Sequence, residues 1–341
     1  MTTIVAASTR MAADMREQPS VLTRIVERRP RLHDALRAVT PDPLRGIALV
    51  GRGSSGNAAL YGRILLEAET GALVTLVPPS LARLSRPGAD RTGFLAFGLS
   101  QSGRTTEIGE TLAALRARGA TTVGIMADPE GPLAQFSDLV IDLACGGERA
   151  VPATKTFTAE LAVLAAATEA LSGAPWPDAT WRAMVRAVAR ALDDEDTARA
   201  VAARIDATAL SVIGAGVFVG VALEGALKLL EAARIAATGW SAASFRHGPM
   251  TLAGPGHPVI AIRVEGKAGD DVRHSLTMIE AAPVITVSDD PTADLPIDGG
   301  LPEALAAIPA AVRLQQVALA VAVRRGVDPD RPPRLKKVTL A

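Results

Sequence analysis

The sequence predicts an α/β protein with two tandem domains, each a doubly wound, mainly parallel sheet flanked by helices. Short runs of β-branched residues alternate with longer helix-forming stretches, which is the pattern of βα units that build a parallel sheet. The chain has 341 residues, and two domains are expected because single hydrophobic cores stop growing at about 250 to 300 residues. In each half a strand-like run ends in glycines before a helix, at residues 50–56 and 213–216.

The first half contains a helical extension over residues 1–40 and an expected domain over residues 41–175. The expected strands are 46–50, 73–77, 93–99, 122–126 and 139–143, and the expected helices are 57–70, 105–118 and 156–171. Residues 172–178 then contain a glycine and two prolines, which interrupt helix and strand alike. We therefore place the domain boundary there.

The second half repeats this order of elements with different spacing. The expected helices are 198–205 and 221–236, and the expected strands are 209–213, 259–264 and 284–287. We assign these elements to a second domain over residues 190–330, followed by a C-terminal tail over residues 331–341.

Composition restricts the classes of partner and the cellular compartment. Apolar residues make up 48% of the chain and charged residues 21%, which predicts a globular protein throughout. Lys plus Arg equals Asp plus Glu at 36 each, so no general field favours nucleic acid or an anionic membrane, and neither is expected as a partner. The single cysteine, Cys145, excludes an internal disulfide and a cysteine-based zinc site, and it fits a cytoplasmic location.

The sequence also predicts that the protein is neither exported nor inserted in a membrane. The first twenty residues contain Arg10, Asp14, Arg16 and Glu17, so they lack the continuous apolar core of a signal peptide. No segment approaches the roughly 18 uninterrupted apolar residues that a membrane-spanning helix needs. The alanine-rich runs are expected to be buried helices instead.

A glycine-rich turn follows the first expected strand and offers one possible phosphate site. Gly51-Arg52-Gly53-Ser54-Ser55-Gly56 has the spacing of a dinucleotide-binding fingerprint, but that pattern alone is a weak signal. A dinucleotide site also needs an acidic residue about 20 positions further on, at the end of the second strand. That strand ends in Pro78-Pro79-Ser80, which argues against nicotinamide binding.

A second turn, after the expected strand 93–99, is a stronger candidate. Residues 99–107, Leu-Ser-Gln-Ser-Gly-Arg-Thr-Thr-Glu, supply four hydroxyls, an amide and a glycine where a helix opens. Backbone N–H groups and the positive end of a helix dipole suit a phosphate at such a place. The alternative is that Thr105 or Thr106 merely caps the helix. One capping residue would suffice and would leave three hydroxyls unexplained, so we favour phosphate binding.

Six separate motifs resemble the isomerase half of the glucosamine-6-phosphate synthase family, which consists of tandem sugar-isomerase (SIS) domains. In their order along the chain they are Gly53-Ser54-Ser55, Ser100-Gln101-Ser102-Gly103, Glu148 to Lys155, Glu224 to Glu231, Arg246-His247-Gly248-Pro249 and Leu335-Lys336-Lys337-Val338-Thr339. The resemblance covers nearly the whole chain from about residue 15. It implies a fold of two tandem SIS domains and a small-molecule sugar phosphate as ligand.

The resemblance also implies which residues bind the sugar phosphate. They are Gly53, Ser54, Ser55, Ser100, Gln101, Ser102, Thr105, Val151 and Ala153. From the residues alone, the segment 148–156 is equally well explained as a loop capped by Thr154 before a helix. Two departures from the family pattern predict a difference in sugar specificity. Ala153 replaces a serine, and Ser244 stands where the family often has a glutamate three residues before the histidine.

The catalytic groups implied by the resemblance are Glu231 as the base that moves a proton between C1 and C2, Lys228 beside it, and His247 for ring opening. The alternative for Lys228 and Glu231 is a surface ion pair three residues apart on a helix, worth a few tenths of a kcal/mol. Their neighbours in the sequence are almost all leucine and alanine, so this helix has little surface to spare. A carboxylate partly removed from water is also a better general base, so we favour catalysis. His33, His257 and His274 have no motif around them and are expected to be structural.

The tail motif implies a lysine that meets the open-chain carbonyl of the sugar. Matching Val338-Thr339 to the family assigns this role to Lys336, with Lys337 where the family tends to have a serine. Two adjacent lysines leave the register open by one residue, and a frayed basic tail is the alternative for both.

Together these residues predict an aminosugar-phosphate deaminase of the SIS type that needs no metal or redox cofactor. The synthase family carries an N-terminal glutaminase domain, whereas this chain begins Met1-Thr2-Thr3, so we expect no release of ammonia from glutamine. The expected reaction converts glucosamine 6-phosphate to fructose 6-phosphate and ammonia. The alternatives are a fructosamine-6-phosphate deglycase, another phosphosugar isomerase, or a sugar-phosphate sensor. A sensor would need a DNA-binding extension, for which residues 1–40 are too short and too evenly charged. The family further implies a homodimer in which His247 reaches the neighbouring subunit's site.

Overall fold

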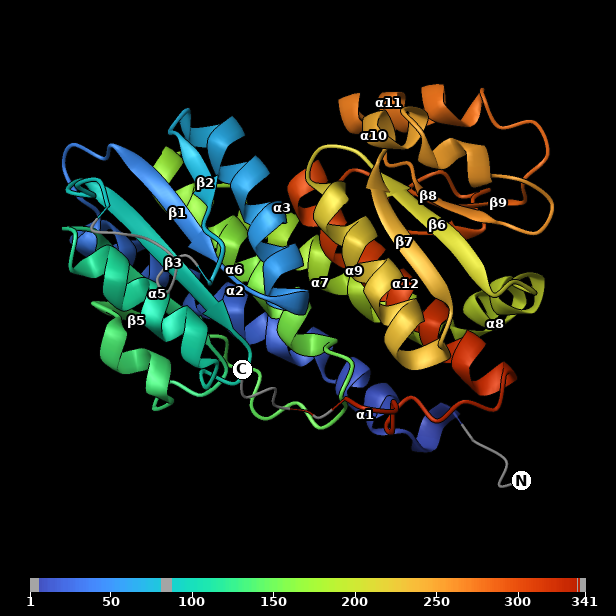
Figure 1. Ribbon diagram of the computed structural model, residues 1–341, viewed down its shortest axis with the longest axis horizontal. Helices are drawn as coiled ribbons and strands as arrows, with labels where there is room; N and C mark the ends of the chain where they lie inside the picture. Colours follow the sequence, from blue (N-terminus) through green and yellow to red (C-terminus); the bar gives the residue numbers. More distant parts are fainter. Residues whose placement is uncertain (1–5, 81–87, 336, 338–341) are drawn as a thin grey trace. The chain divides into compact units, whose positions relative to one another are not determined.

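A computed structural model of the chain describes residues 6–80, 88–335 and 337 (Figure 1). The protein contains two five-stranded sheets with helices around them, as the sequence predicts. The chain forms two compact units. The first-sheet unit comprises residues 20–148 and 159–178, and the second-sheet unit comprises the described residues of 1–19, 149–158 and 179–337.

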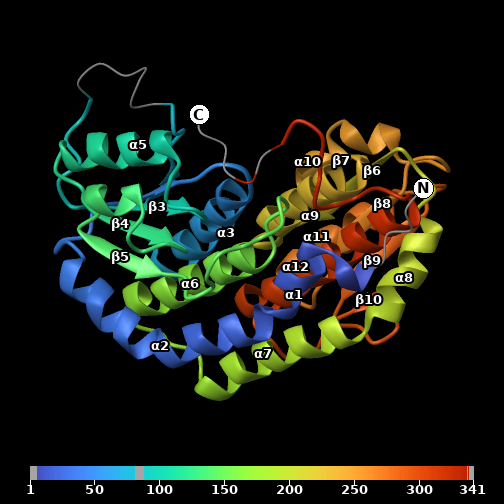
Figure 2. The same cartoon turned by 90° about the horizontal axis from the view of Figure 1, so that it is seen from below.

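The first-sheet unit contains a parallel sheet with the strand order β2-β1-β3-β4-β5. Its strands are β1 (Gly46–Val50), β2 (Val74–Leu76), β3 (Phe94–Ser100), β4 (Thr121–Met126) and β5 (Leu139–Asp142). The helices of this half are α2 (Gln18–Val39), α3 (Gly53–Thr70), α5 (Thr106–Arg116), the 3-10 helix η2 (Pro132–Phe136) and α6 (Lys155–Ser172). In Figure 2, α5 lies on one side of this sheet and α6 and α2 lie on the other.

A hydrophobic core lies between α5 and the sheet, because the apolar residues of α5 recur at helical spacing and so share one face of the helix. Ile108, Leu112 and Leu115 recur at helical spacing on α5 and are buried against Ala48 and Ala96 of the two central strands. This packing holds the first turn of α5 directly after the end of β3. The loop between these two elements is therefore anchored at both ends.

The second-sheet unit repeats the same topology. Its strands are β6 (Ala209–Gly214), β7 (Ala236–Ser241), β8 (Val259–Ile262), β9 (Val284–Ser288) and β10 (Leu295–Pro296), in the order β10-β9-β8-β6-β7, all parallel. Its helices are α1 (Arg10–Arg16), α7 (Asp178–Asp193), α8 (Glu195–Arg204), α9 (Phe218–Ala233), α10 (Ala242–Arg246), α11 (Lys267–Leu276) and α12 (Glu303–Arg324), with the 3-10 helices η1 (Ala6–Ser8) and η3 (Pro249–Leu252). Written in the reverse direction, the order is β7-β6-β8-β9-β10, which corresponds strand by strand to β2-β1-β3-β4-β5 of the first sheet. The repeat seen in the sequence is therefore a repeat of sheet topology.

Two strands of the second sheet were missed by the sequence analysis, namely β7 and the two-residue β10. The expected helix 221–236 begins earlier, ends at Ala233, and is followed by strand β7. β7 contains only one β-branched residue, Thr238, so its pattern does not indicate a strand. Its pairing with β6 is possible because Gly239 lets α9 approach closely. A Cβ at this position would lie 2.5 Å from Leu223 Cα.

Helix α12 explains the most apolar stretch of the chain. Among the described residues it is the one helix long and apolar enough to cross a membrane, but 89% of its apolar window is buried inside the protein. It packs against α9 and α8, as a core helix does. Its polar residues also have protein partners, since the Arg313 guanidinium donates to Asp194 and to the carbonyl of Pro296.

Candidate functional site

The loops after β1 and β3 lie next to each other at the carboxyl edge of the first sheet. β1 and β3 are adjacent parallel strands, with Val50 paired to Gly98 near their ends. The chain leaves β1 toward β2 on one side and β3 toward β4 on the other, so the strand order reverses at this point. Ligands of doubly wound sheets bind at such a switch point. The topology therefore brings Gly53–Ser55 and Ser100–Thr105 to the place where a ligand is expected.

The Ser100–Thr105 loop is a tight turn that presents hydroxyls at the start of α5. Ser100 ends β3 and is buried, and the left-handed Gly103 (φ 63°) lets the chain turn, with its N–H donating to the Ser100 carbonyl. Thr105 occupies the N-cap position of α5, yet its side chain makes no capping hydrogen bond. Its hydroxyl instead accepts from Ser100 Oγ at 3.3 Å. The capping interpretation of Thr105 is therefore wrong.

Gln101 and Ser102 are held by contacts within the same unit. Gln101 Nε2 donates to Glu148 Oε2 at 3.0 Å, and the Gln101 carbonyl accepts from the N–H of Ala127. Ser102 Oγ accepts from the Arg104 N–H at 3.2 Å. These bonds fix the loop before any ligand arrives. Sequence reasoning missed Glu148 as the partner of Gln101, because 47 residues separate them.

In the loop after β1, the neighbouring serines differ in burial and in hydrogen bonding. Gly53 opens α3 with a left-handed φ of 54°, and Ser54 is half-buried. Ser55 is buried and donates from Oγ to Glu160 Oε1 at 2.7 Å. Ser55 is thus fixed from the interior by a carboxylate on α6. No sequence signal links these two residues, which lie 105 positions apart.

An ion pair joins the two loops. The Arg52 guanidinium, about half exposed, contacts the buried carboxylate of Glu107 in the first turn of α5. A negative side chain is favourable at this end of a helix. Arg52 is therefore a cation held beside both loops, which the sequence analysis did not single out.

The loop over residues 149–155 belongs to the second-sheet unit. Val151 is half-buried and Ala153 is buried. The loop ends at Lys155, whose side chain is only 2% exposed and whose Nζ lies 2.6 Å from Glu17 Oε2 and 3.3 Å from Asp14 Oδ1. Burial lowers the pKa of Lys155, but the hydrogen bond to Glu17 and the charge of Asp14 outweigh it and hold that pKa above its ordinary value.

Helix α9 carries a buried cluster of three charged residues. Lys228 Nζ lies 2.5 Å from Glu231 Oε2 and 3.3 Å from Glu224 Oε1. The Lys228 side chain is 1% exposed, that of Glu224 is 2% exposed, and that of Glu231 is 17% exposed. The surface ion pair considered from the sequence is therefore wrong. Glu231 is the member of the cluster that solvent or a ligand can reach, which suits a proton-transfer group.

His247 follows α10 and is exposed. Its Nδ1 lies 2.8 Å from the Ala243 carbonyl oxygen, and because a carbonyl only accepts, Nδ1 carries a proton there. Nε2 is then the nitrogen that can exchange a proton. Two other histidines contact polar groups of the fold. His33 Nε2 lies 3.2 Å from Glu169 Oε2, and His257 Nε2 lies 3.0 Å from Ser211 Oγ.

Lys336, the predicted tail lysine, lies outside the described residues. Within the part of the chain that the structure describes, no group of three or more His, Cys, Asp or Glu side chains is arranged to hold a metal ion. The predicted residues thus fall into a hydroxyl-rich pair of loops in one unit and a loop, a charged cluster and a histidine in the other.

Comparison with known proteins identifies relatives that match most of the chain. A model of the SIS domain matches residues 45–170 and 205–287. Glutamine-fructose-6-phosphate aminotransferase (isomerizing) from Gloeobacter violaceus is 34% identical over 96% of this chain and 58% of its own length. The protein of the same name from Methanothermobacter thermautotrophicus is 34% identical over 85% of this chain and 51% of its length. The chain therefore spans about half the length of the curated relatives it matches.

Solved structures resemble the entire chain. Glucosamine-6-phosphate deaminase from Thermotoga maritima has a TM-score of 0.80 and 25% identity, over 98% of this chain and 100% of its own. Tagatose-6-phosphate ketose/aldose isomerase from Escherichia coli has a TM-score of 0.82 and 22% identity, over 98% of both chains, a likeness that concerns the fold alone.

Proposed function

The chain belongs to the SIS domain family, and from this premise we propose that it is a phosphosugar enzyme that deaminates glucosamine 6-phosphate. The observation that carries the proposal is the Ser100–Thr105 loop. It lies at a switch point, is rich in neutral donors, and opens a helix whose N-cap side chain does not cap it. A site of this kind suits a phosphate better than a neutral ligand.

The phosphate group would be bound by hydroxyls and backbone N–H groups. Ser100, Ser102 and Thr105 supply hydroxyls at the start of α5, and Ser54 supplies one from the neighbouring loop. Arg52 adds a guanidinium beside both loops, where it is paired with the carboxylate of Glu107. Because these groups recognise the phosphate and not the sugar, they would accept any hexose 6-phosphate. Selection among sugars then belongs to other residues, with Val151 and Ala153 among them.

The proton transfer would be carried out by Glu231. After His247 assists opening of the ring, Glu231 removes the proton from C2 of the open-chain aminosugar and delivers it to C1. The product is a C2 ketimine, and addition of one water releases ammonia and leaves fructose 6-phosphate. Lys228 orients the Glu231 carboxylate through their 2.5 Å contact. Lys336 is proposed to meet the open-chain carbonyl.

The deaminating direction is supported by one relative in particular. The Thermotoga maritima structure that matches 98% of this chain at 25% identity is named a glucosamine-6-phosphate deaminase. The curated relatives are named aminotransferases, and they are about twice as long as the segment that this chain matches. The same C1–C2 proton transfer would serve deamination of glucosamine 6-phosphate or its formation from fructose 6-phosphate. An assay of the substrates distinguishes the two.

A substrate panel with the purified protein tests the proposal. Glucosamine 6-phosphate is expected to yield equimolar ammonia and fructose 6-phosphate, whereas glucosamine without phosphate is not expected to react at a comparable rate. Fructosamine 6-phosphates provide the second arm. If only these compounds react, the protein is a deglycase and the proposed substrate is wrong, while the assignment of the phosphate loop stands.

A further inference from the structure

Helix α1 lies outside the residues that match the SIS domain model, yet it contacts the loop that the proposed function places at the sugar. The Asp14 side chain is fully buried, and its Oδ2 accepts from the N–H groups of Arg149 at 2.7 Å and Ala150 at 2.8 Å. Its Oδ1 accepts from Arg149 Nε at 3.1 Å. A single carboxylate thus fixes two consecutive peptide units at the start of the 149–155 loop.

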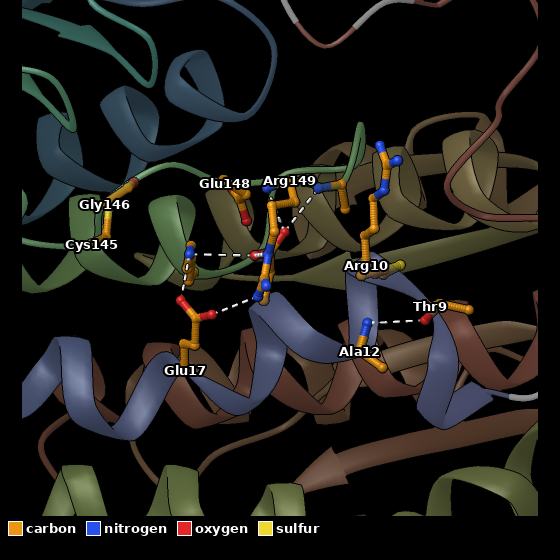
Figure 3. Close-up of polar contacts among 12 residues, drawn as sticks. Thr9, Arg10, Ala12, Glu17, Cys145, Gly146, Glu148 and Arg149 are labelled. Atoms are coloured by element: carbon orange, nitrogen blue, oxygen red, sulfur yellow. Dashed lines mark hydrogen bonds and ion pairs between the residues drawn. The ribbon is translucent and has the colours of Figure 1, made fainter.

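The last residue of the same loop, Lys155, is also bound by side chains at the C-terminal end of α1. Lys155 Nζ contacts both Asp14 and Glu17, the C-cap residue of α1, and Glu17 also accepts from Arg149 at 2.5 Å. Figure 3 shows Glu17 reaching toward Arg149 across this network. Val151 and Ala153 are therefore carried on a loop whose first and last residues are both bound to α1.

The opposite end of α1 holds a second segment. The N–H of Arg10 donates to Asp330 Oδ2 at 2.6 Å, and the N–H of Met11 donates to Asp330 Oδ1 at 3.1 Å. Asp330 precedes Lys336, the proposed tail lysine, by six residues. Helix α1 is thus bonded both to the loop that carries Val151 and Ala153 and to Asp330, which precedes the proposed tail lysine in the sequence.

A purely stabilising role does not account for the chemistry of this contact. Burying the Asp14 carboxylate and the Lys155 ammonium together is costly, and apolar residues of similar volume often stabilise a fold as well or better. Buried charge-assisted bonds do hold their groups in one geometry, because each donor left without its partner is penalised. The network therefore suits a loop whose exact placement matters.

We propose that α1 is part of the substrate site and that Asp14 is a positioning residue. It holds the 149–155 loop in the conformation that receives the sugar hydroxyls and amine. This inference rests on the proposed function, because it takes the loop to face the sugar. It predicts that changes at Asp14 alter recognition of the sugar and leave recognition of the phosphate intact.

Two substitutions at Asp14 separate its contacts. In Asp14→Asn the amide oxygen can still accept both backbone N–H groups, whereas the amide nitrogen faces the donors of Arg149 and Lys155. Asp14→Ala removes every bond. Asp34→Asn, on the exposed surface of α2, is the matched control for loss of a carboxylate charge. We expect KM for glucosamine 6-phosphate to rise about tenfold in Asp14→Asn and further in Asp14→Ala, because a displaced loop misplaces the sugar.

Calorimetric binding of inorganic phosphate and hydrogen exchange complete the experiment. The affinity for phosphate is expected to stay within about twofold in both Asp14 variants, and the amides of residues 149–155 are expected to exchange faster. Unchanged KM in both variants would overturn the inference, as would a parallel loss of phosphate affinity. If Asp14→Ala does not fold, the same measurements on Asp14→Asn alone test the inference.

The proposed function can fail separately from this inference. If the wild-type protein neither binds phosphate nor converts glucosamine 6-phosphate, the function is wrong. The role of Asp14 is then decided by exchange alone. Faster exchange confined to residues 149–155 in Asp14→Asn, with an unchanged melting temperature, supports the positioning role, and unchanged exchange contradicts it.

Discussion

The ammonium of Lys228 lies 2.5 Å from the carboxylate of Glu231, one turn further along α9. Lys228 is almost fully buried, so the pair is not a solvated surface contact, and only the glutamate retains appreciable exposure. The proposed base is therefore presented at the edge of a buried charge cluster. Glu224 keeps Lys228 paired even when Glu231 is altered, so Glu231 can be substituted without leaving a buried cation alone.

Thr105→Val tests the phosphate site. The substitution keeps the shape of the side chain and removes the hydroxyl that stands at the N-cap of α5 without capping it. A lost hydrogen bond to a charged group costs about 1.5 to 3 kcal/mol, so KM for glucosamine 6-phosphate is expected to rise at least about tenfold. Thr121→Val, at the start of β4, is the control. A KM within twofold of the wild type would contradict the assignment.

Mixed oligomers test the expected reach of His247 into a neighbouring subunit. His247→Ala and Glu231→Gln are each expected to be nearly inactive. If His247 acts across a dimer, each mixed dimer contains one intact site, and random mixing restores about a quarter of wild-type activity. If His247 serves its own chain, mixing restores nothing. Ammonia release after the two variants are unfolded and refolded together distinguishes the outcomes.

Asp194 links acid stability to the packing of α12. Burial raises the pKa of Asp194, but hydrogen bonds from Thr197 and Arg313 outweigh this and hold it below its ordinary value. Because the folded pKa is lowered, this carboxylate stabilises the fold above the unfolded pKa of about 3.9, and the stabilisation is lost as the pH falls through the folded pKa. Asp194→Asn is therefore expected to melt at a lower temperature than the wild type at pH 7. The difference should shrink below pH 4, and a difference independent of pH would refute this account.

The repeated topology raises the question of a second phosphate site. At the corresponding position of the second sheet, after β8, the Ala268 N–H at the start of α11 donates to Glu303 Oε1 at 3.1 Å. The chain's own carboxylate thus takes the place of an anion, and residues 263–267 contain no hydroxyl. Calorimetry is expected to find one phosphate per chain. Glu303→Ala should lower the stability by about 1 kcal/mol, as loss of a helix cap does, without changing KM. Two phosphates per wild-type chain would contradict this interpretation.

Local sequence patterns predicted much of the fold and part of the site. Strands β1 and β4 follow from runs of apolar and β-branched residues, and the Lys228–Glu231 contact follows from helical spacing. β7 could not be predicted, because its pairing depends on the close approach that Gly239 permits. The partners of the loop residues could not be predicted either. Glu160 and Asp14 lie more than 100 residues from Ser55 and Arg149, and only the folded chain brings them together.

The central claim is that Glu231 transfers the proton that leads to deamination of an aminosugar phosphate. The most direct measurement follows ammonia and fructose 6-phosphate formed from glucosamine 6-phosphate by the wild type, by Glu231→Gln, and by the exposed control Glu280→Gln. Equimolar products from the wild type and the control are expected. The Glu231 variant should lose about 100-fold to 10,000-fold in kcat, the contribution typical of a general base. Wild-type kcat in Glu231→Gln, or no ammonia from the wild-type enzyme, would contradict the claim.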